Sequence, residues 1–274
     1  MQIRRTIWLL AAAMLGLQVA TERAGAAELL GVDFAGTIYD VAVPLGTASN
    51  PRSTGIATLS GLAMSPSGVI YSHDAATNHL YRINPLTGQA TEIGFLGLDA
   101  TEGDLAFHPQ TGVLYGAQTA GADRLYTIDP STGQTTIVGS IVQSGDISAM
   151  AFDASGTLWA LDTSANQSLY SLDPSSAAIL STIPLVGDFL GNTAGMDFDP
   201  VTGRLFVSAR NGFSSEGPSF FYWLTMDGTL NVLGETGLPQ GYSGLRFIPE
   251  PGTIFPVVLG VVAIFARRRR TGRN

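Results

Sequence analysis

Short apolar segments alternate with turn signals through the middle of the chain, and the pattern repeats. In residues 103–140 an apolar segment that ends at Phe107 is followed by a Pro-x-x-Gly turn and a second apolar segment at residues 113–115. A third segment around Tyr126, an Asp-Pro-Ser-Thr-Gly turn and a fourth segment at residues 135–138 complete the unit. Short apolar segments bounded by Gly, Pro, Asn and Asp are typical of β-strands. The unit therefore predicts four short strands.

Two markers of this unit recur along the chain at similar intervals. The turn residue that follows the first strand occurs at Pro66, Pro109, Ala154, Pro200 and Pro249, with spacings of 43, 45, 46 and 49 residues. A tyrosine of the third strand occurs at Tyr39, Tyr81, Tyr126, Tyr170 and Tyr222. A repeat of about 45 residues with four strands is the signature of a β-propeller blade.

The repeat begins and ends inside a blade. Residues 28–34 align with a second strand, residues 38–43 with a third and residues 55–59 with a fourth, so this copy lacks a first strand. Residues 245–248 align with a first strand that nothing follows. We therefore expect an all-β domain at residues 28–248: a five-bladed β-propeller of four-stranded blades closed across the termini, since closure removes exposed sheet edges. An open sandwich of hairpins is the alternative.

The third-strand motif at residues 125–133 reads Leu-Tyr-x-Ile-Asp-Pro-x-Thr-Gly. This motif and its copies resemble those of bacterial surface propellers of the YVTN and NHL-like kind, over nearly all of residues 28–248. The resemblance implies the fold. It does not select a function, because propellers host binding, scaffolding and catalysis alike.

The N-terminal segment has the layout of an export signal. Two arginines, Arg4 and Arg5, precede an apolar segment at residues 7–20 and a run of small residues at 24–27. This order is typical of a secretory signal peptide. We expect residues 1–27 to form a signal helix that is removed; an amphipathic first helix is the alternative.

The C-terminal segment, residues 249–274, combines three features in a fixed order. They are the turn-forming residues Pro249, Glu250, Pro251 and Gly252, an apolar segment at residues 253–266, and the cluster Arg267, Arg268, Arg269 and Arg270. The apolar segment is shorter than the roughly 20 residues of a stable span, so it predicts a short transmembrane helix. Its arginines would stay on the cytoplasmic side. A plain membrane anchor is one interpretation.

This order of features resembles the PEP-CTERM sorting signal. The resemblance implies an exosortase as processing partner and transient anchoring in the inner membrane of a diderm bacterium. It also implies a final location at the cell surface or in the extracellular matrix, in an exopolysaccharide or biofilm setting. Whether the tail is cleaved or retained stays open.

The charge of the chain excludes one class of partner. Arginine supplies all 14 of the Lys and Arg residues, against 22 acidic residues. Without residues 1–27 and the arginine-rich residues 267–274, six arginines remain against 21 acidic residues, a net charge of about −15. Nucleic acid binding needs a basic surface, so nucleic acid is not expected as a partner. The chain has no cysteine, which excludes disulfides and thiolate chemistry.

Several carboxylates fall in the longer loops. In a propeller, the loops between second and third strands and those between blades lie at one end of the ring, which we call the long-loop face. A weak Ca²⁺ site there is one hypothesis, since Ca²⁺ prefers oxygen ligands; its candidate ligands are Asp99, Glu102, Asp104 and Asp146. Solvated loop acids are the alternative, and no other cofactor is expected. His73 and His79 flank one loop and are a further candidate metal pair; the alternative is that they are ordinary loop and turn residues.

The longest loop carries the candidate ligand-binding residues. They are Arg210, Asn211, Phe213 and Glu216. An exposed ring beside polar groups can stack on a sugar. The alternative is that the nearby aromatic residues fill the core between blades.

The sequence lacks the motifs of common catalytic sites. It has no Gly-x-Ser-x-Gly, His-Glu-x-x-His, Walker or Rossmann motif. We therefore expect a non-enzymatic surface propeller that binds or scaffolds an exopolysaccharide or a protein through the long-loop face. A metal-dependent propeller hydrolase or lyase with channel carboxylates is one alternative, and a structural matrix protein without a discrete ligand is the other.

Overall fold

The computed structural model describes residues 28–100, 103–118, 123–142, 144–165, 167–188, 190–212 and 218–248. The folded body is the compact unit Glu28–Ile248. The expected signal helix, sorting motif, transmembrane segment and arginine cluster all lie outside the described residues. Within those residues, no helix is both long and apolar enough to cross a bilayer.

Five four-stranded antiparallel sheets form the body, as the repeat predicts. Blade A contains β20 (Gly244–Ile248), β1 (Glu28–Val32), β2 (Thr37–Val41) and β3 (Ala48–Ser53). Blade B contains β4 (Leu59–Met64), β5 (Ile70–Asp74), β6 (His79–Ile83) and β7 (Ala90–Phe95). Blade C contains β8 (Leu105–Phe107), β9 (Leu114–Gln118), β10 (Arg124–Ile128) and β11 (Thr135–Ser140).

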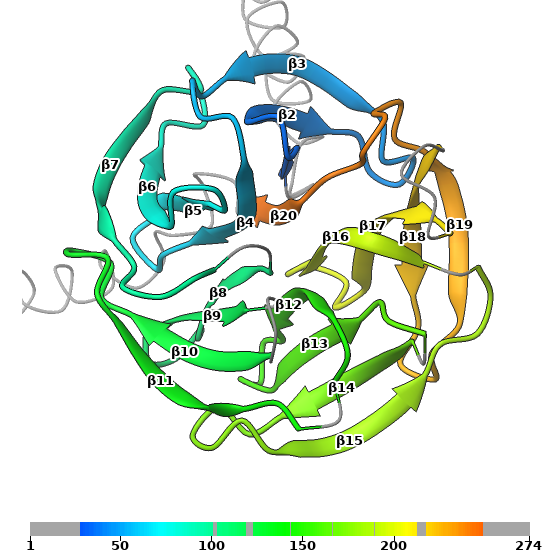
Figure 1. The fold of residues 1–274 in the computed structure, drawn as a ribbon. Coiled ribbons are helices and arrows are strands. Elements are labelled where there is room, and N and C mark those ends of the chain that lie inside the picture. The colour runs from blue at the N-terminus through cyan, green and yellow to red at the C-terminus, as the bar shows by residue number, and fades with distance from the viewer. Residues whose placement is uncertain are drawn as a thin grey trace, which may run out of the picture. The chain divides into compact units, whose positions relative to one another are not determined.

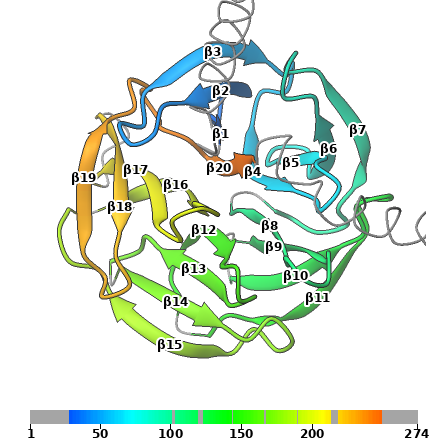
Figure 2. The same ribbon diagram turned by 180° about the vertical axis from the view of Figure 1, so that it is seen from behind.

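The remaining two blades follow the same order. Blade D contains β12 (Ile147–Phe152), β13 (Leu158–Asp162), β14 (Ser168–Leu172) and β15 (Ile179–Pro184). Blade E contains β16 (Leu190–Phe198), β17 (Leu205–Asn211), β18 (Ser219–Leu224) and β19 (Leu230–Glu235). The first strand of every blade lies near the axis of a ring and the fourth lies on its circumference (Figure 1; from behind in Figure 2). The predicted five-bladed propeller is confirmed.

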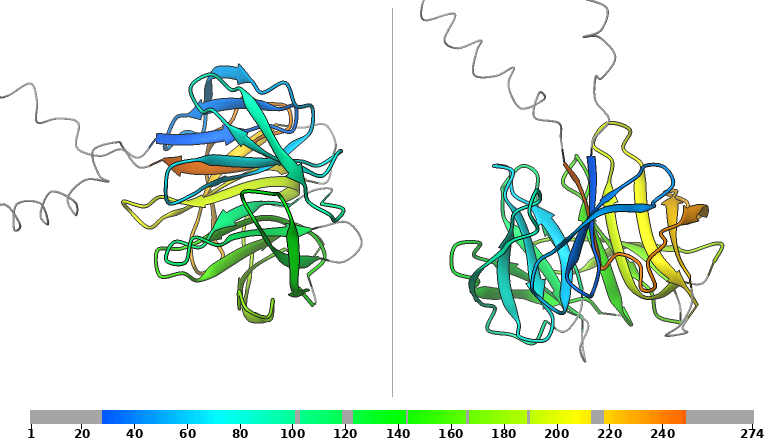
Figure 3. Two further views of the ribbon diagram at one scale, coloured as in Figure 1. Left: turned by 90° about the vertical axis from the view of Figure 1, so that its left-hand side faces the viewer. Right: turned by 90° about the horizontal axis from the view of Figure 1, so that it is seen from above.

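The ring closes where the two ends of the folded body meet. β20 pairs with β1 in an antiparallel register that runs from Glu28 opposite Ile248 to Val32 opposite Gly244. The two strands therefore lie side by side, with the beginning of β1 next to the end of β20 (Figure 3). The predicted composite blade is confirmed.

One predicted strand was wrong. The fourth strand of blade A is Ala48–Ser53 rather than residues 55–59, and Leu59 already begins the first strand of blade B. A fourth strand lies at the outer edge of its blade and is mostly exposed, so it carries no apolar signal; this one contains Asn50 with a φ of 51° and Pro51. The apolar residues that suggested a strand at 55–59 belong to the link between blades.

The antiparallel registers place both classes of longer loop at one end of each sheet. Arg124, at the beginning of β10, lies opposite Gln118 at the end of β9 and opposite Ser140 at the end of β11. The loop before Arg124 and the link after Ser140 therefore leave from the same end. We call the opposite end, where the short turns, the beginning of β1 and the end of β20 lie, the tight-turn face.

The blades pack on one another through apolar layers. Ile38 and Leu30 of blade A share a buried cluster with Ile70 and Ile83 of blade B, and similar clusters join B to C, C to D and D to E. Between E and A, the ring of Phe206 lies 5.7 Å from that of Phe247. Each fully buried large apolar side chain stabilises the fold by about 1.5–3 kcal/mol, so these layers are the main source of stability.

A second contact joins the blades at their circumference. In several blades a β-bulge near the end of the fourth strand carries a glycine, such as Gly94, Gly139 and Gly234. A Cβ atom at Gly139 would lie 2.5 Å from the carbonyl oxygen of Ser176, in the turn before β15 of the next blade. The corresponding distance from Gly94 to the oxygen of Thr132 is 2.3 Å. These glycines let the turn of one blade lie directly on the strand of the blade before it.

Candidate functional site

A buried carboxylate joins the first strands of three blades. Asp104 is 1% exposed; its Oδ1 accepts backbone N–H hydrogen bonds from Leu105 (2.8 Å) and Leu62 (3.2 Å), and its Oδ2 accepts one from Met150 (3.2 Å). These donors belong to the first strands of three blades. Burial raises the pKa of Asp104 well above its usual value, against the opposing effect of the three N–H groups. Its oxygens therefore hold the ring together.

A second buried carboxylate joins blades E and A. Oδ2 of Asp197 accepts the backbone N–H of Phe247 at 2.7 Å, and its Oδ1 lies 3.3 Å from the guanidinium of Arg246. Burial raises the pKa of Asp197, although the Arg246 charge opposes this. This ion pair is also part of the ring closure.

The candidate Ca²⁺ ligands are not gathered into one site. Asp99 is exposed and accepts a hydrogen bond from Asn78 at 3.4 Å, Asp146 is half-buried beside Ser148, and Asp104 is buried; Glu102 lies outside the described residues. Among the residues that the structure does describe, no three His, Asp or Glu side chains lie close enough to hold a metal ion. The Ca²⁺ hypothesis gains no support from this geometry.

Other carboxylates of the long-loop face accept hydrogen bonds from the same blade or from the blade that follows their link. The hydroxyls of third-strand tyrosines donate to them: Tyr39 to Asp33 at 2.9 Å, Tyr170 to Asp162 at 3.2 Å and Tyr222 to Asp188 at 3.2 Å. Asp74 accepts hydrogen bonds from Thr77 and Ala76. These contacts hold the loops and links of this face against the third strands.

The two histidines of blade B do not share a site. His73 lies opposite Leu80, while His79 lies opposite Asp74, so the two side chains point to opposite faces of the sheet. His73 is fully buried, and burial lowers its pKa to about 4. The candidate metal pair is therefore not formed, and the alternative of ordinary loop and strand-end residues fits this geometry.

A partly exposed aromatic side chain, Phe95, lies beside His79 at the long-loop end of blade B. Phe95 is 52% exposed, and no other aromatic residue in the described part of the chain is as open to solvent. It ends β7 opposite His79, and the two ring centroids are 5.5 Å apart at 53°. Nδ1 of His79 lies 2.8 Å from the carbonyl oxygen of Thr77, so Nδ1 carries a proton and donates. Nε2 then points toward Glu92, with 3.8 Å to its Oε1.

Asn78 fixes the loop next to this ring. It has a φ of 58°, its carbonyl accepts the N–H of Leu96 at 2.8 Å, and its Oδ1 accepts that of Ala100 at 2.8 Å. Its Nδ2 is the group that donates to Asp99. We call the set of Asn78, His79, Glu92, Phe95 and Asp99 the Phe95 patch. The Phe95 patch combines a solvent-exposed aromatic ring with an amide, an imidazole and two carboxylates, and hydrogen bonds fix the amide and the imidazole in place.

The predicted ligand loop is only partly described. Arg210 is half-buried and Asn211 is exposed at the end of β17, while Phe213 and Glu216 lie outside the described residues. Farther along, Trp223 is half-buried, with the guanidinium of Arg204 4.4 Å from its ring centroid. Sugar binding by this loop stays a prediction.

The sequence contained a signal for the Phe95 patch. The bulge glycine is followed by Phe95 in blade B, but by Ser140 in blade C and Glu235 in blade E. An aromatic residue where other copies are polar marks a departure from the repeat. A comparison of the repeat copies at exposed positions identifies Phe95, whereas a search for long loops does not.

Comparisons with known proteins agree on the fold. No protein-family model and no curated protein matches the sequence. A crystal structure of a protein of unknown function from Bacteroides caccae is similar, with a TM-score of 0.53 and 13% identity over 82% of this chain and 99% of the other. At this identity the likeness shows the fold alone.

Two enzyme structures are more distantly similar. Kuenenia stuttgartiensis hydrazine synthase has a TM-score of 0.46 and 11% identity over 74% of this chain and 64% of the other. The PQQ-bound aldose sugar dehydrogenase of Streptomyces coelicolor has a TM-score of 0.45 and 17% identity over 66% and 69%.

Proposed function

We propose that the protein is an exported, non-catalytic β-propeller that binds a neutral glycan of the extracellular matrix through the Phe95 patch. The observation that carries the proposal is the exposed ring of Phe95 next to His79 and Glu92. An aromatic face can cover the apolar C–H side of a sugar ring. The surrounding groups supply both donors and acceptors for its hydroxyls.

The charge around the patch selects among glycans. Glu92 and Asp99 are both exposed, and the folded body is rich in acidic residues. A polysaccharide with carboxylate or sulfate groups is repelled by such a surface. A neutral polymer escapes this repulsion.

Substitution of the ring tests the binding proposal. The full chain is titrated with cellohexaose, maltohexaose and dextran by calorimetry. We expect Phe95→Ala to lower the affinity at least tenfold and Phe95→Trp to retain it. Leu180→Ala is a matched control, because Leu180 is a 65% exposed apolar residue on the fourth strand of another blade. Equal binding by the wild type and Phe95→Ala would refute this role.

The proposed location depends on the two ends of the chain. The signal-peptide layout of residues 1–27 and the PEP-CTERM-like segment 249–274 support export and processing by an exosortase. In the folded body, Glu28 and Ile248 are paired, so both segments join it at the same point. Mass spectrometry of the cell-surface fraction should find a new N-terminus at Glu28 and loss of the arginine cluster. Replacing Pro249 and Glu250 by alanine should block that loss, and an uncleaved chain in the cytoplasm would contradict the proposal.

A further inference from the structure

A shallow groove of about 540 Å³ crosses the tight-turn face of blade B, at the opposite end of the blade from the Phe95 patch. The beginning of β5, the end of β6 and the turn after it form its walls. Its apolar lining includes Val69, Ile70, Ile83, Pro85 and Leu86, and Arg82 is its charged residue. We call it the Arg82 groove.

In three other blades the residue equivalent to Arg82 has a side-chain partner. The equivalent residue in each blade follows the third-strand tyrosine. In blade A it is Asp40, which pairs with Arg52 at 2.6 Å; in blade D it is Ser171, which bonds Ser181 at 2.6 Å. In blade E it is Trp223, the residue that stacks with Arg204. Arg82 is exposed, and within the described ranges it has no carboxylate partner.

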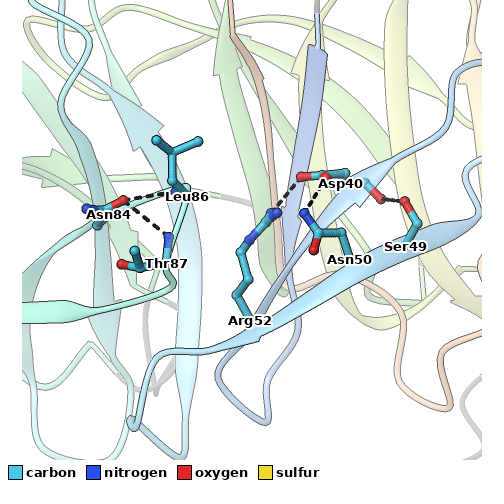
Figure 4. A network of polar contacts seen from close by, with 7 residues as sticks. All are labelled: Asp40, Ser49, Asn50, Arg52, Asn84, Leu86 and Thr87. Carbon is cyan, nitrogen blue, oxygen red and sulfur yellow. Dashed lines mark hydrogen bonds and ion pairs between the residues drawn. The ribbon is translucent and has the colours of Figure 1, made fainter.

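The turn beside Arg82 is held in one conformation. Oδ1 of Asn84 accepts backbone N–H hydrogen bonds from Leu86 at 2.9 Å and Thr87 at 3.3 Å (Figure 4). Leu86 is consequently presented to solvent, 85% exposed, without internal packing. On the other side of the turn, Arg52 is already neutralised by Asp40 (Figure 4). Among the described residues that line the groove, the guanidinium of Arg82 is therefore the charged group without a carboxylate partner.

We propose that the Arg82 groove binds a segment of a partner protein in which an acidic residue adjoins an aliphatic one. A guanidinium matches a carboxylate with two parallel hydrogen bonds. The aliphatic wall suits a Leu, Ile or Val side chain. None of the residues that line the groove is aromatic, which favours a peptide over a sugar polymer. This inference goes beyond glycan binding and does not depend on it.

Titration of the full chain with acetyl-Leu-Glu-Leu-Glu-amide tests the inference. The arginine Nε–Hε NMR resonances are followed, with Arg82 assigned from Arg82→Lys. We expect a saturable shift of the Arg82 resonance and at least fivefold weaker binding by Arg82→Gln and by Leu86→Ser. Arg124→Gln is the matched control, since Arg124 is also exposed but lies at the long-loop end of blade C. The Arg124→Gln variant should bind the peptide as tightly as the wild type does.

Several outcomes would overturn the inference. One is the absence of a saturable shift, and another is equal binding of the peptide with Gln in place of Glu. A third is binding of polygalacturonate, but not the peptide, that depends on Arg82; this would assign the groove to an acidic polysaccharide. Arg82→Lys keeps the positive charge but cannot make two parallel hydrogen bonds to a carboxylate. This variant should therefore bind the peptide less tightly than the wild type and more tightly than Arg82→Gln. Failure of the Phe95 patch in glycan binding would leave these results unaffected.

Discussion

The hydroxyl of Tyr242 donates a hydrogen bond of 3.0 Å to the carbonyl oxygen of Gly46, across 196 positions of sequence. Tyr242 precedes β20, and Gly46 lies in the turn between β2 and β3. The side chain is completely buried, and a Cβ atom at Gly31 would lie 2.3 Å from its ring. This bond therefore fixes the place where the C-terminal strand enters the first blade.

We expect Tyr242→Phe to lower the free energy of unfolding by about 1 kcal/mol, because the buried carbonyl of Gly46 loses its tyrosine donor. Tyr126→Phe is the matched control: Tyr126 is also fully buried, but its hydroxyl has no hydrogen-bond partner. Removing that hydroxyl should leave stability unchanged or raise it. Urea unfolding at neutral pH measures the free energy of unfolding of both variants and of the wild type. Equal losses in the two variants would show that the bond to Gly46 contributes nothing of its own.

The bulge glycines make a second prediction about contacts between blades. Gly139→Ala should lower the free energy of unfolding by more than about 2 kcal/mol, since its Cβ would overlap the Ser176 oxygen and force blades C and D apart. Gly55→Ala is the comparison, because a Cβ there meets nothing within 4 Å and only the φ of 79° is unfavourable. That strain costs about 1–2 kcal/mol. Thermal unfolding should rank Gly139→Ala as the less stable variant, and the reverse order would exclude the proposed contact.

The fold was predictable because the first and third strands are buried. The residue types at Leu105, Phe107 and Tyr126 repeat at similar intervals, and each of the three packs between two blades. The outermost strands face solvent on one edge, so their residues follow no apolar pattern. This is why β3, with Asn50 and Pro51, was missed while β1 and β20 were found.

The candidate site was less predictable, because a sequence does not show where a side chain points. Asp104 comes from a link between blades, which suggested a ligand for Ca²⁺, but it turns inward to the N–H groups of three strands. The Phe95 patch depends on a pairing between β6 and β7 that brings His79 to Phe95. Loop length pointed instead to residues around Arg210. Exposure and hydrogen bonding distinguish the structural Asp104 from the Phe95 patch, and the spacing of residues in the sequence predicts neither property.

The buried position of Asp104 predicts an unusual dependence of stability on pH. Its pKa is raised in the folded state, while in the unfolded chain it ionises near 3.9. At a pH between the two values the unfolded chain binds fewer protons, so the contribution of Asp104 falls as pH rises. We expect the advantage of the wild type over Asp104→Asn to be largest near pH 4 and to shrink toward pH 7.

The matched control for Asp104 has the opposite sign. Hydrogen bonds from Ser131 lower the pKa of Asp129 in an exposed turn. The advantage of the wild type over Asp129→Asn should be present above pH 4 and disappear on acidification through the folded pKa. Urea unfolding at several pH values compares the two variants. An advantage of Asp104 that grows with pH would mean that its three N–H donors outweigh burial.

The ion pair of Asp197 with Arg246 makes the last prediction. Arg246→Met leaves a buried carboxylate without its cation, which should lower the free energy of unfolding by about 3–5 kcal/mol at pH 7. Losing the guanidinium raises the pKa of Asp197 further above its already raised value. The carboxyl is then protonated in the folded state at low pH, so the deficit should be smaller at pH 4 and grow as pH rises. Arg246→Lys keeps the charge and should lose less. A deficit of Arg246→Met that is the same at both pH values would show that Arg246 stabilises the ring by packing rather than by its charge.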